Sequence, residues 1–242
     1  MLVGHGPSLD KANFHRGVAG LSPTNRQPLA FKYDRSYYLD MKGESSRGRI
    51  VAEGVQALSS AGLAGITVGR LADASGMSKS GMFAHFRSRQ ALETALLDEA
   101  ARLAERHVVE PAMAFPVGLA RLRALIDGWL GWAPRAGLPG GCPIAAALFE
   151  LDDVEGETRD HVAVLDAHWR ALLANLVREA IASGELAEQT SVDQFVWELC
   201  GIYLAHHSFS RFARDPDSDR RAKQAVDGLI DRNRIPAPPA TR

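Results

Sequence analysis

The sequence contains only two cysteines among its 242 residues, Cys142 and Cys200. Two are too few for a disulfide framework, and they lack the paired C-x-x-C spacing of a zinc site. We therefore interpret both as buried thiols and expect neither a metal nor another cofactor. Redox sensing is the alternative role for either cysteine.

The sequence also lacks long apolar segments. No stretch approaches the ~20 apolar residues of a membrane span, and the N-terminus lacks the basic-then-apolar order of a signal peptide. Since 46% of the residues are hydrophobic, the chain can still build packed cores. We expect a soluble, cytoplasmic protein with no membrane partner.

Alternation of polar and apolar residues, the mark of strands, is missing over any useful length, whereas helical periodicity is present almost everywhere after Arg47. The expected fold class is therefore all-α. The predicted helices cover residues 47–60, 67–75, 78–85, 89–109, 117–135, 143–152, 156–183, 191–213 and 217–231. Ser88 is the expected N-cap of the helix over 89–109, and Ser191-Val-Asp-Gln194 is an expected capping box at the start of the helix over 191–213.

Proline and loop-forming residues suggest four segments. We predict a flexible N-terminal extension over 1–43, a DNA-binding domain over 44–104, a C-terminal domain over 112–232 and a flexible tail over 233–242. Pro111 and Pro116 bracket the predicted break between the domains. Met41 is an alternative start of the native chain, because a polar lead connects it to the first convincing helix, and a structured or DNA-contacting arm is the rival interpretation of the residues before it.

The formal net charge of −1 hides an asymmetry along the chain. Residues 41–92 contain seven basic and three acidic side chains, whereas residues 93–242 contain an excess of seven acidic ones. One small region can therefore face phosphates, while the larger region faces something else.

Residues 67–86, TVGRLADASGMSKSGMFAHF, have the spacing that two crossing helices require. Leu71 and Ala72 face inward, Gly76 permits the turn, and Ser78 can cap the second helix. A generic α-hairpin has similar spacing. The basic surroundings and the supporting helix before the segment instead favour a helix-turn-helix, whose second helix enters the major groove of DNA with its N-terminal end.

At fixed spacing, the chain resembles the tetracycline-repressor (TetR) family over about residues 47–97. The resemblance rests on Arg49-Ile50, Ala61-Gly62, Thr67-Val68, Leu71-Ala72, Ser75-Gly76-Met77-Ser78, Phe83-Ala-His-Phe86, Ser88-Arg89 and Leu92. It implies an N-terminal helix-turn-helix domain that binds double-stranded operator DNA and a C-terminal helical domain for dimerisation and ligand binding. It further implies a dimeric transcriptional regulator, most simply a repressor of a palindromic operator, which a small-molecule effector releases.

The resemblance also assigns the DNA contacts. These are Thr67, Val68, Ser78, Lys79, Ser80, Gly81, Phe83, His85 and Arg89. Thr67, His85 and Arg89 are expected to contact phosphates, and Arg89 stands where the family usually has a lysine. Phe83 stands where a tyrosine is usual, so we expect a packing contact there. We expect few side chains to read bases directly, so sequence recognition should depend on Lys79, on backbone approach at Gly81 and on DNA shape.

The C-terminal half offers large aromatic side chains for an apolar or aromatic effector. The candidate ligand-binding residues are Trp129, Trp132, Phe149, Trp169, Tyr203 and His206, with Trp197 as a further aromatic candidate. Plain core or dimer packing is the alternative role of each. His206 and His207 with nearby carboxylates and histidines could form a metal site, but the spacing is not diagnostic, and we interpret Glu150 to Asp153 as a solvated helix end.

Two predicted helices carry seams of coiled-coil spacing. The seam residues are Val162, Leu165, Trp169, Leu172 and Leu176, followed by Phe195, Leu199, Ile202, His206 and Phe209. Seams of this width can pack on their own subunit and on a second copy at once, and the alternative is that both helices are simply core helices. Two rival functions are an all-α enzyme, for which no catalytic spacing is found, and a dimerising module that binds DNA poorly.

Overall fold

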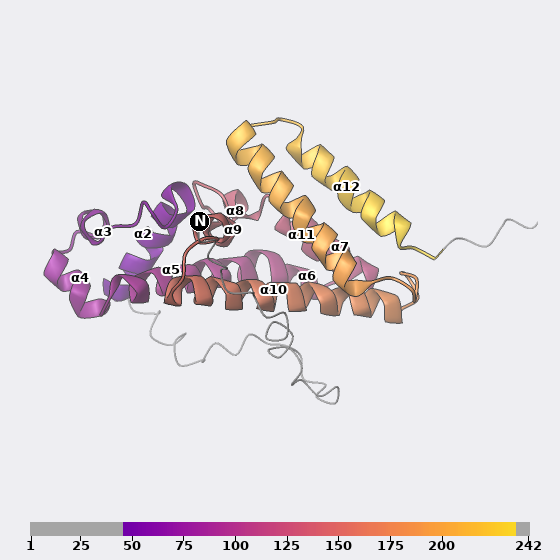
Figure 1. The fold of residues 1–242 in the computed structure, drawn as a ribbon, viewed down its shortest axis with the longest axis horizontal. Coiled ribbons are helices and arrows are strands. Elements are labelled where there is room, and N and C mark those ends of the chain that lie inside the picture. The colour runs from indigo at the N-terminus through magenta and orange to yellow at the C-terminus, as the bar shows by residue number, and fades with distance from the viewer. Residues whose placement is uncertain (1–45, 236–242) are drawn as a thin grey trace, which may run out of the picture. The chain divides into compact units, whose positions relative to one another are not determined.

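The computed structural model describes residues 46–235 of the chain. Every extended element of this range is helical, which confirms the all-α prediction (Figure 1). None of the helices in this range is long and apolar enough to cross a membrane. The predicted extension over 1–43, the choice between Met1 and Met41, and residues 236–242 of the predicted tail lie outside the described residues.

The helix-turn-helix and its supports form the first group of helices. They are α2 (Ser46–Ala61), α3 (Val68–Ser75), α4 (Lys79–His85) and α5 (Arg89–Ala104). Thus the predicted helix over 67–75 and its successor over 78–85 each begin one residue later than expected. The shift arises because Thr67 and Ser78 are the N-caps of these helices.

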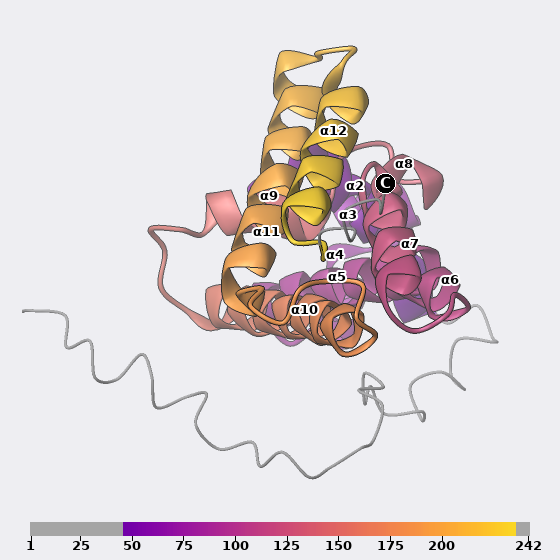
Figure 2. The same cartoon turned by 90° about the vertical axis from the view of Figure 1, so that its right-hand side faces the viewer.

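The second group contains both long and short helices. They are η2 (Glu105–Val109), α6 (Glu110–Met113), α7 (Leu119–Trp129), α8 (Trp132–Arg135), α9 (Pro143–Glu150), α10 (Glu157–Ala182), α11 (Val192–Ser208), η3 (Phe209–Ala213) and α12 (Ser218–Arg232). Helices α11 and α12 run side by side (Figure 2). Beyond α12, Arg234 forms an antiparallel bridge with Leu186, so the chain stays attached past residue 232.

The predicted end of the fourth helix at residue 109 is wrong, because the chain stays helical from Arg89 to Met113, and the break before α7 begins between Pro111 and Pro116. The segment Glu105–Val109 is a π-helical turn, and the Glu110 N–H donates to the Glu105 carbonyl oxygen. This wider turn restarts the helix just before Pro111, which then occupies the first turn of α6. There the missing proline N–H costs no hydrogen bond.

The continuous helix from α5 to α6 is buried in two successive hydrophobic cores. Leu92, Leu96 and Leu97 of α5 lie in the core of the helix-turn-helix group. Ala100 and Val108 lie further along in the core of the second group. One rigid element therefore contributes side chains to both cores.

The core of the helix-turn-helix group also contains residues from much later in the chain. Ala147 of α9 and Val162 and Leu165 of α10 are buried together with Leu71 and Met82. Consequently α9 packs on α2 and α5, and α10 packs on α5, the helices that support the helix-turn-helix.

The predicted seams of α10 and α11 face largely inward. Val162, Leu165 and Leu176 are buried on α10, and Phe195, Leu199 and His206 are buried on α11. The capping box at the start of α11 is half formed. Ser191 Oγ accepts from Gln194 N at 3.3 Å, but the Gln194 side chain donates to Glu198 instead of returning to Ser191.

The solvated helix end expected around Glu150 is wrong for Glu150 itself. Its two carboxylate oxygens accept from Leu63 N at 3.2 Å and Ala64 N at 3.0 Å, in the turn between α2 and α3. The turn exposes these N–H groups because Gly62 adopts a left-handed conformation with φ of 66°. A carboxylate is a strong acceptor for two adjacent N–H groups.

Replacing Gly62 with alanine should therefore be more damaging than its backbone angle alone requires. A Cβ at Gly62 would lie 2.2 Å from Glu150 Oε1, whereas one at Gly76, also at φ of 66°, would meet no atom within 4 Å. We expect Gly76→Ala to lower the free energy of unfolding, measured in urea, by about 1–2 kcal/mol. Gly62→Ala should lower it by roughly 1.5–3 kcal/mol more, because the added Cβ displaces the hydrogen bonds of the Glu150 carboxylate. Equal losses would contradict this account.

Candidate nucleic-acid interface and aromatic cluster

The α3 helix begins at an exposed threonine. Thr67 is extended, and its Oγ1 accepts from Arg70 N at 3.2 Å. A hydroxyl group has one hydrogen to donate besides its acceptor lone pairs, so the Thr67 proton remains available to a phosphate. Val68, the next predicted contact, is half-buried and opens α3.

A tight turn aims the next helix. Gly76 has the left-handed conformation, and Met77 N donates to Ala72 O at 2.9 Å. Ser78 then caps α4, since its Oγ accepts from Gly81 N at 3.1 Å and lies 3.0 Å from Ser80 Oγ. The glycine at position 76 is needed for its backbone angle, as the sequence predicted.

The first turn of α4 is open to solvent. Ser78, Lys79 and Ser80 are exposed, as is His85 at the other end of the helix. The Lys79 side chain passes beside α3, because a Cβ at Gly69 would lie 3.4 Å from Lys79 Cε. Gly81 is half-buried against Met77 and Ser78, where a Cβ would lie 3.3 Å from each. The side chain of Phe83 is outside the described part of the chain.

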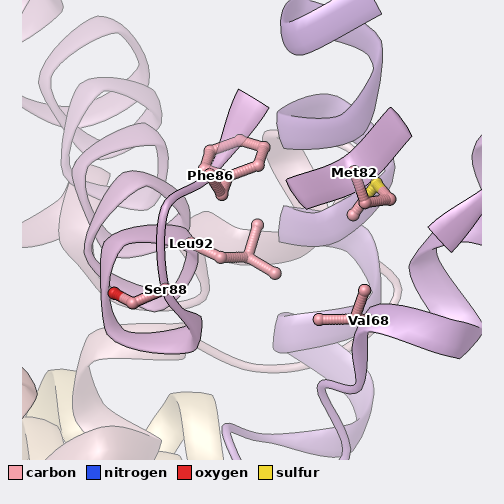
Figure 3. A pocket seen from close by; sticks show the side chains of 5 residues that line it. All are labelled: Val68, Met82, Phe86, Ser88 and Leu92. Carbon is pink, nitrogen blue, oxygen red and sulfur yellow. The ribbon is translucent and has the colours of Figure 1, made fainter. Parts of the chain in front are cut away.

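Apolar side chains hold α3 and α4 on α5. Leu71, Ala72, Met82 and Phe86 are at most 4% exposed, so the two helices share one core. A small, mostly apolar pocket between them and the start of α5 is lined by Val68, Met82, Phe86, Ser88 and Leu92 (Figure 3). This packing fixes the angle at which α4 presents its first turn.

The start of α5 adds a further cation beside a helix N-terminus. Ser88 caps α5 as predicted, with Oγ accepting from Ala91 N at 3.0 Å. Arg89 keeps 59% of its side chain exposed, although Nε donates to Glu93 Oε1 at 2.7 Å and Nη2 donates to Leu63 O at 3.4 Å. Neither of these two hydrogen bonds uses Nη1, so part of the guanidinium group faces solvent.

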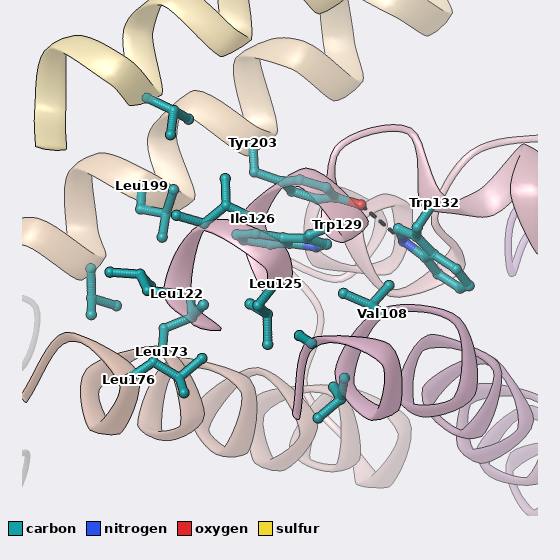
Figure 4. Close-up of a cluster of buried hydrophobic side chains, with 14 of the residues drawn as sticks. Val108, Leu122, Leu125, Ile126, Trp129, Trp132, Leu173, Leu176, Leu199 and Tyr203 are labelled. Carbon is teal, nitrogen blue, oxygen red and sulfur yellow. Dashed lines mark hydrogen bonds between the residues drawn. The ribbon is translucent and has the colours of Figure 1, made fainter. Parts of the chain in front are cut away.

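Four of the six candidate effector residues meet in the second core. The rings of Trp129 and Tyr203 stack with centroids 3.9 Å apart, and Trp169 lies 5.0 Å from Trp129. Trp132 Nε1 donates to the Tyr203 hydroxyl oxygen at 3.2 Å (Figure 4). We call Trp129, Trp132, Trp169 and Tyr203 the aromatic cluster.

Two polar groups of the aromatic cluster have unusual surroundings. Burial raises the pKa of Tyr203 well above its usual value, so its hydroxyl remains protonated and can donate. Trp169 Nε1 is buried and has no hydrogen-bond partner within residues 46–235. A buried donor without a partner is costly, and a ligand with an acceptor group would satisfy it.

The remaining candidates lie apart from the aromatic cluster or have other partners. Phe149 is 58% exposed and Trp197 is 71% exposed. His206 is buried, with Nε2 lying 2.6 Å from Asp219 Oδ1 of α12. His161 pairs instead with Asp98 at 2.8 Å, so these two histidines have separate carboxylate partners.

The cysteines do not favour the redox alternative. Cys142 is buried and caps α9, with Sγ accepting from Ala145 N at 3.4 Å. Burial raises the pKa of the Cys200 thiol to about 11. Since the thiolate is the reactive form, Cys200 is poorly suited to oxidation at neutral pH.

Sequence reasoning missed the hydrogen bonds of three side chains near Arg89 and the α2–α3 turn. Glu150 binds the α2–α3 turn, while Glu93 accepts from Arg89 and also from Thr158 Oγ1 at 2.8 Å. An i, i+4 pairing could have suggested the contact between Arg89 and Glu93. No local sequence signal predicts the contact of Glu150 with the α2–α3 turn or of Thr158 with Glu93, because 65 or more residues separate the partners.

Two family profiles match the sequence at the two groups of helices. Residues 50–96 match the profile described as bacterial regulatory proteins, tetR family. Residues 118–226 match the tetracyclin repressor-like C-terminal domain. The chain belongs to the TetR family of transcriptional regulators. As a TetR-family protein it is a DNA-binding regulator, and members of this family are not enzymes.

Solved structures agree with this fold. A TetR regulator from Chloroflexus aurantiacus is 25% identical, with a TM-score of 0.69 over 79% of this chain and 95% of that one. A TetR-family regulator from Cytophaga hutchinsonii is 16% identical, with a TM-score of 0.71 over 79% and 96% of the two chains.

A third similar structure is AibR in complex with isovaleryl coenzyme A and operator DNA. It is 20% identical, with a TM-score of 0.60 over 80% of this chain and 100% of that one. At this identity, the similarity to AibR establishes the fold alone. None of the curated proteins matches the sequence.

Proposed function

We propose that this TetR-family protein is a cytoplasmic repressor that binds a palindromic operator as a homodimer and releases it when a small apolar or aromatic effector binds. The observation that carries the DNA-binding part is the exposed first turn of α4. Lys79 and Ser80 extend from this turn, close in sequence to the exposed Arg89 at the start of α5. Two helix N-termini and two cations suit an anionic groove.

The predicted roles of individual residues fit this arrangement. We assign phosphate contacts to Thr67, His85 and Arg89, since all three side chains are exposed. Lys79, Ser80 and Gly81 are assigned to the groove, with Val68 and Ser78 holding the ends of α3 and α4. Phe83 is retained as a proposed packing contact.

The exposed face of α11 supports the proposed homodimer. Trp197, Gly201, Ala205 and Ser208 are exposed at spacings of 4, 4 and 3 residues, which places them on one face of α11, and the exposed Phe212 follows in η3. Trp197 is 71% and Phe212 91% exposed, and a Cβ at Gly201 would meet no atom within 4 Å. Large aromatics around small residues allow a second helix to approach closely and bury apolar surface.

The aromatic cluster is the proposed effector site. Its stacked rings suit an apolar or aromatic compound, and the unpartnered Trp169 Nε1 suits one that carries a hydrogen-bond acceptor. Trp129, Trp132, Trp169 and Tyr203 remain the proposed contacts. Phe149 and His206 are not retained, because Phe149 is exposed on α9 and His206 already pairs with Asp219.

The first test concerns DNA binding through α4. Lys79→Ala should weaken binding to DNA from upstream of the protein's own gene and reduce the salt slope by about 1, because the complex loses one cation that displaces a counterion from the DNA. Fluorescence anisotropy from 50 to 200 mM salt measures both quantities. Lys223→Ala removes an exposed lysine from α12 and should leave both unchanged. If the two variants behave alike, α4 is not the recognition helix.

The second test concerns the dimer. Trp197→Glu should convert the dimer into monomers at micromolar concentration, because it places a charge in the proposed apolar contact. Sedimentation velocity measures the mass, and far-UV circular dichroism checks that the helices remain. Phe115→Glu changes another exposed aromatic residue, in the α6–α7 connection, and should stay dimeric. A dimeric Trp197→Glu would exclude this face of α11.

The third test concerns the effector. In a thermal-shift screen of apolar and aromatic compounds, any compound that raises the Tm by binding in the aromatic cluster should also lower DNA affinity, because it favours the state that does not bind DNA. Trp169→Phe removes Nε1–H and should weaken the shift for compounds with an acceptor group. A stabilising compound that leaves DNA affinity unchanged would contradict the proposed release.

A further inference from the structure

The connection between α9 and α10 is attached at one end to the α2–α3 turn and at the other end to α5, which begins at the predicted phosphate contact Arg89. At the end of α9, Glu150 accepts from the backbone of Leu63 and Ala64. At the start of α10, the Thr158 hydroxyl donates to Glu93 Oε2 at 2.8 Å. Only the short segment 151–156 separates the two helices.

Arg89 lies between these two attachments. Its Nε donates to Glu93 Oε1, and its Nη2 donates to Leu63 O, the residue whose N–H binds Glu150. A continuous series of hydrogen bonds therefore runs from Thr158 through Glu93 and Arg89 to the α2–α3 turn and Glu150. We call this series the clasp.

One end of the clasp is buried and the other end is exposed. Glu93 and Thr158 are 7% and 8% exposed, whereas the Arg89 side chain is 59% exposed. The inner groups are thus fixed by packing, and the outer end of Arg89 is the part that faces solvent. A buried carboxylate with both oxygens bonded holds a guanidinium in one orientation more firmly than an exposed pair does.

We infer that Thr158, Glu93 and Glu150 are positioning residues that set the phosphate contact of Arg89, so that the α9–α10 connection controls DNA affinity. This inference rests on the proposed function. If Thr158 releases Glu93, one buried carboxylate oxygen loses its partner and Glu93 turns further toward Arg89. The guanidinium is then drawn away from the phosphate, which lowers affinity without altering α4.

The alternative is a purely structural role, in which the clasp only stabilises the packing of α10 on α5. His161 and Asp98 also join these two helices, with Nε2 and Oδ1 2.8 Å apart. A structural role would lower the free energy of unfolding in a Thr158 variant. It would not make the effect on DNA binding depend on Arg89.

The decisive experiment is a double-mutant cycle on the full chain, measured by anisotropy with DNA from upstream of its gene. Arg89→Ala should weaken binding and reduce the salt slope by about 1. Thr158→Val should weaken binding about 5-fold in the otherwise unchanged protein and have no further effect in the Arg89→Ala background. Thr158→Ser, which keeps the hydroxyl, should bind within about 2-fold of the unchanged protein.

Thr190→Val is the matched control, because Thr190 is 8% exposed and its Oγ1 has no hydrogen-bond partner within residues 46–235. Its DNA affinity should be unchanged. For the other end of the clasp, Glu150→Ala should weaken binding, whereas Asp153→Ala, an exposed carboxylate nearby, should not.

Several outcomes would overturn the inference. They are an unchanged affinity in Thr158→Val, an equal loss for Thr158→Val in both backgrounds, or equal affinities for Glu150→Ala and Asp153→Ala. If the unchanged protein shows no salt-dependent binding to DNA, the proposed function fails. If it binds and only Arg89→Ala weakens the complex, the clasp alone is refuted.

Discussion

The rest of the structure depends on the burial of one continuous helix, from Arg89 to Met113, in two hydrophobic cores. Its first half carries Leu92 and Leu96 beneath the helix-turn-helix, and its second half carries Val108 and Ala112 beneath the aromatic cluster. Because a close-packed interior does not deform smoothly, a displacement of this helix in one core is felt in the other. The π-helical turn at Glu105–Val109 lies in the second core and allows the helix to pass Pro111.

The two cores do not divide at a single point of the chain. Ala147, Val162 and Leu165, from the segment that matches the C-terminal family profile, pack in the core of the helix-turn-helix. The hydrogen bonds of Glu150 and Thr158 follow the same route. These hydrogen bonds fix how α9 and α10 are oriented on the helix-turn-helix group. The free energy that stabilises this packing comes mainly from the burial of apolar side chains.

The sequence predicted the local elements well because their signals are local. Ser78, Ser88 and Ser191 cap the helices that they precede, and Gly76 adopts the left-handed angle that the turn requires. Each prediction depended on residues within one helical turn. The helix end expected at residue 109 was placed too early for the same reason, since Pro111 was judged without the preceding π-helical turn, which sequence periodicity does not reveal.

The candidate site was less predictable, because it combines residues from distant parts of the chain. Aromatic character was the criterion for most of the effector candidates, and it does not distinguish buried from exposed side chains. It selected the exposed Phe149 as well as Trp129 and Tyr203, whose rings stack in the core. The seams of α10 and α11 were correctly seen as apolar. Their burial within one chain left a different face of α11, around Gly201, open to solvent.

By itself, the sequence determined the all-α class and the caps and turn of the helix-turn-helix. These follow from backbone preferences and helical periodicity, which act over a few residues. Only the tertiary structure decided which aromatics form a cluster, which helix face stays exposed, and that Glu150 and Thr158 fasten the α9–α10 connection around Arg89. Contacts between residues 65 or more positions apart depend on how the cores close, and no short segment encodes that outcome.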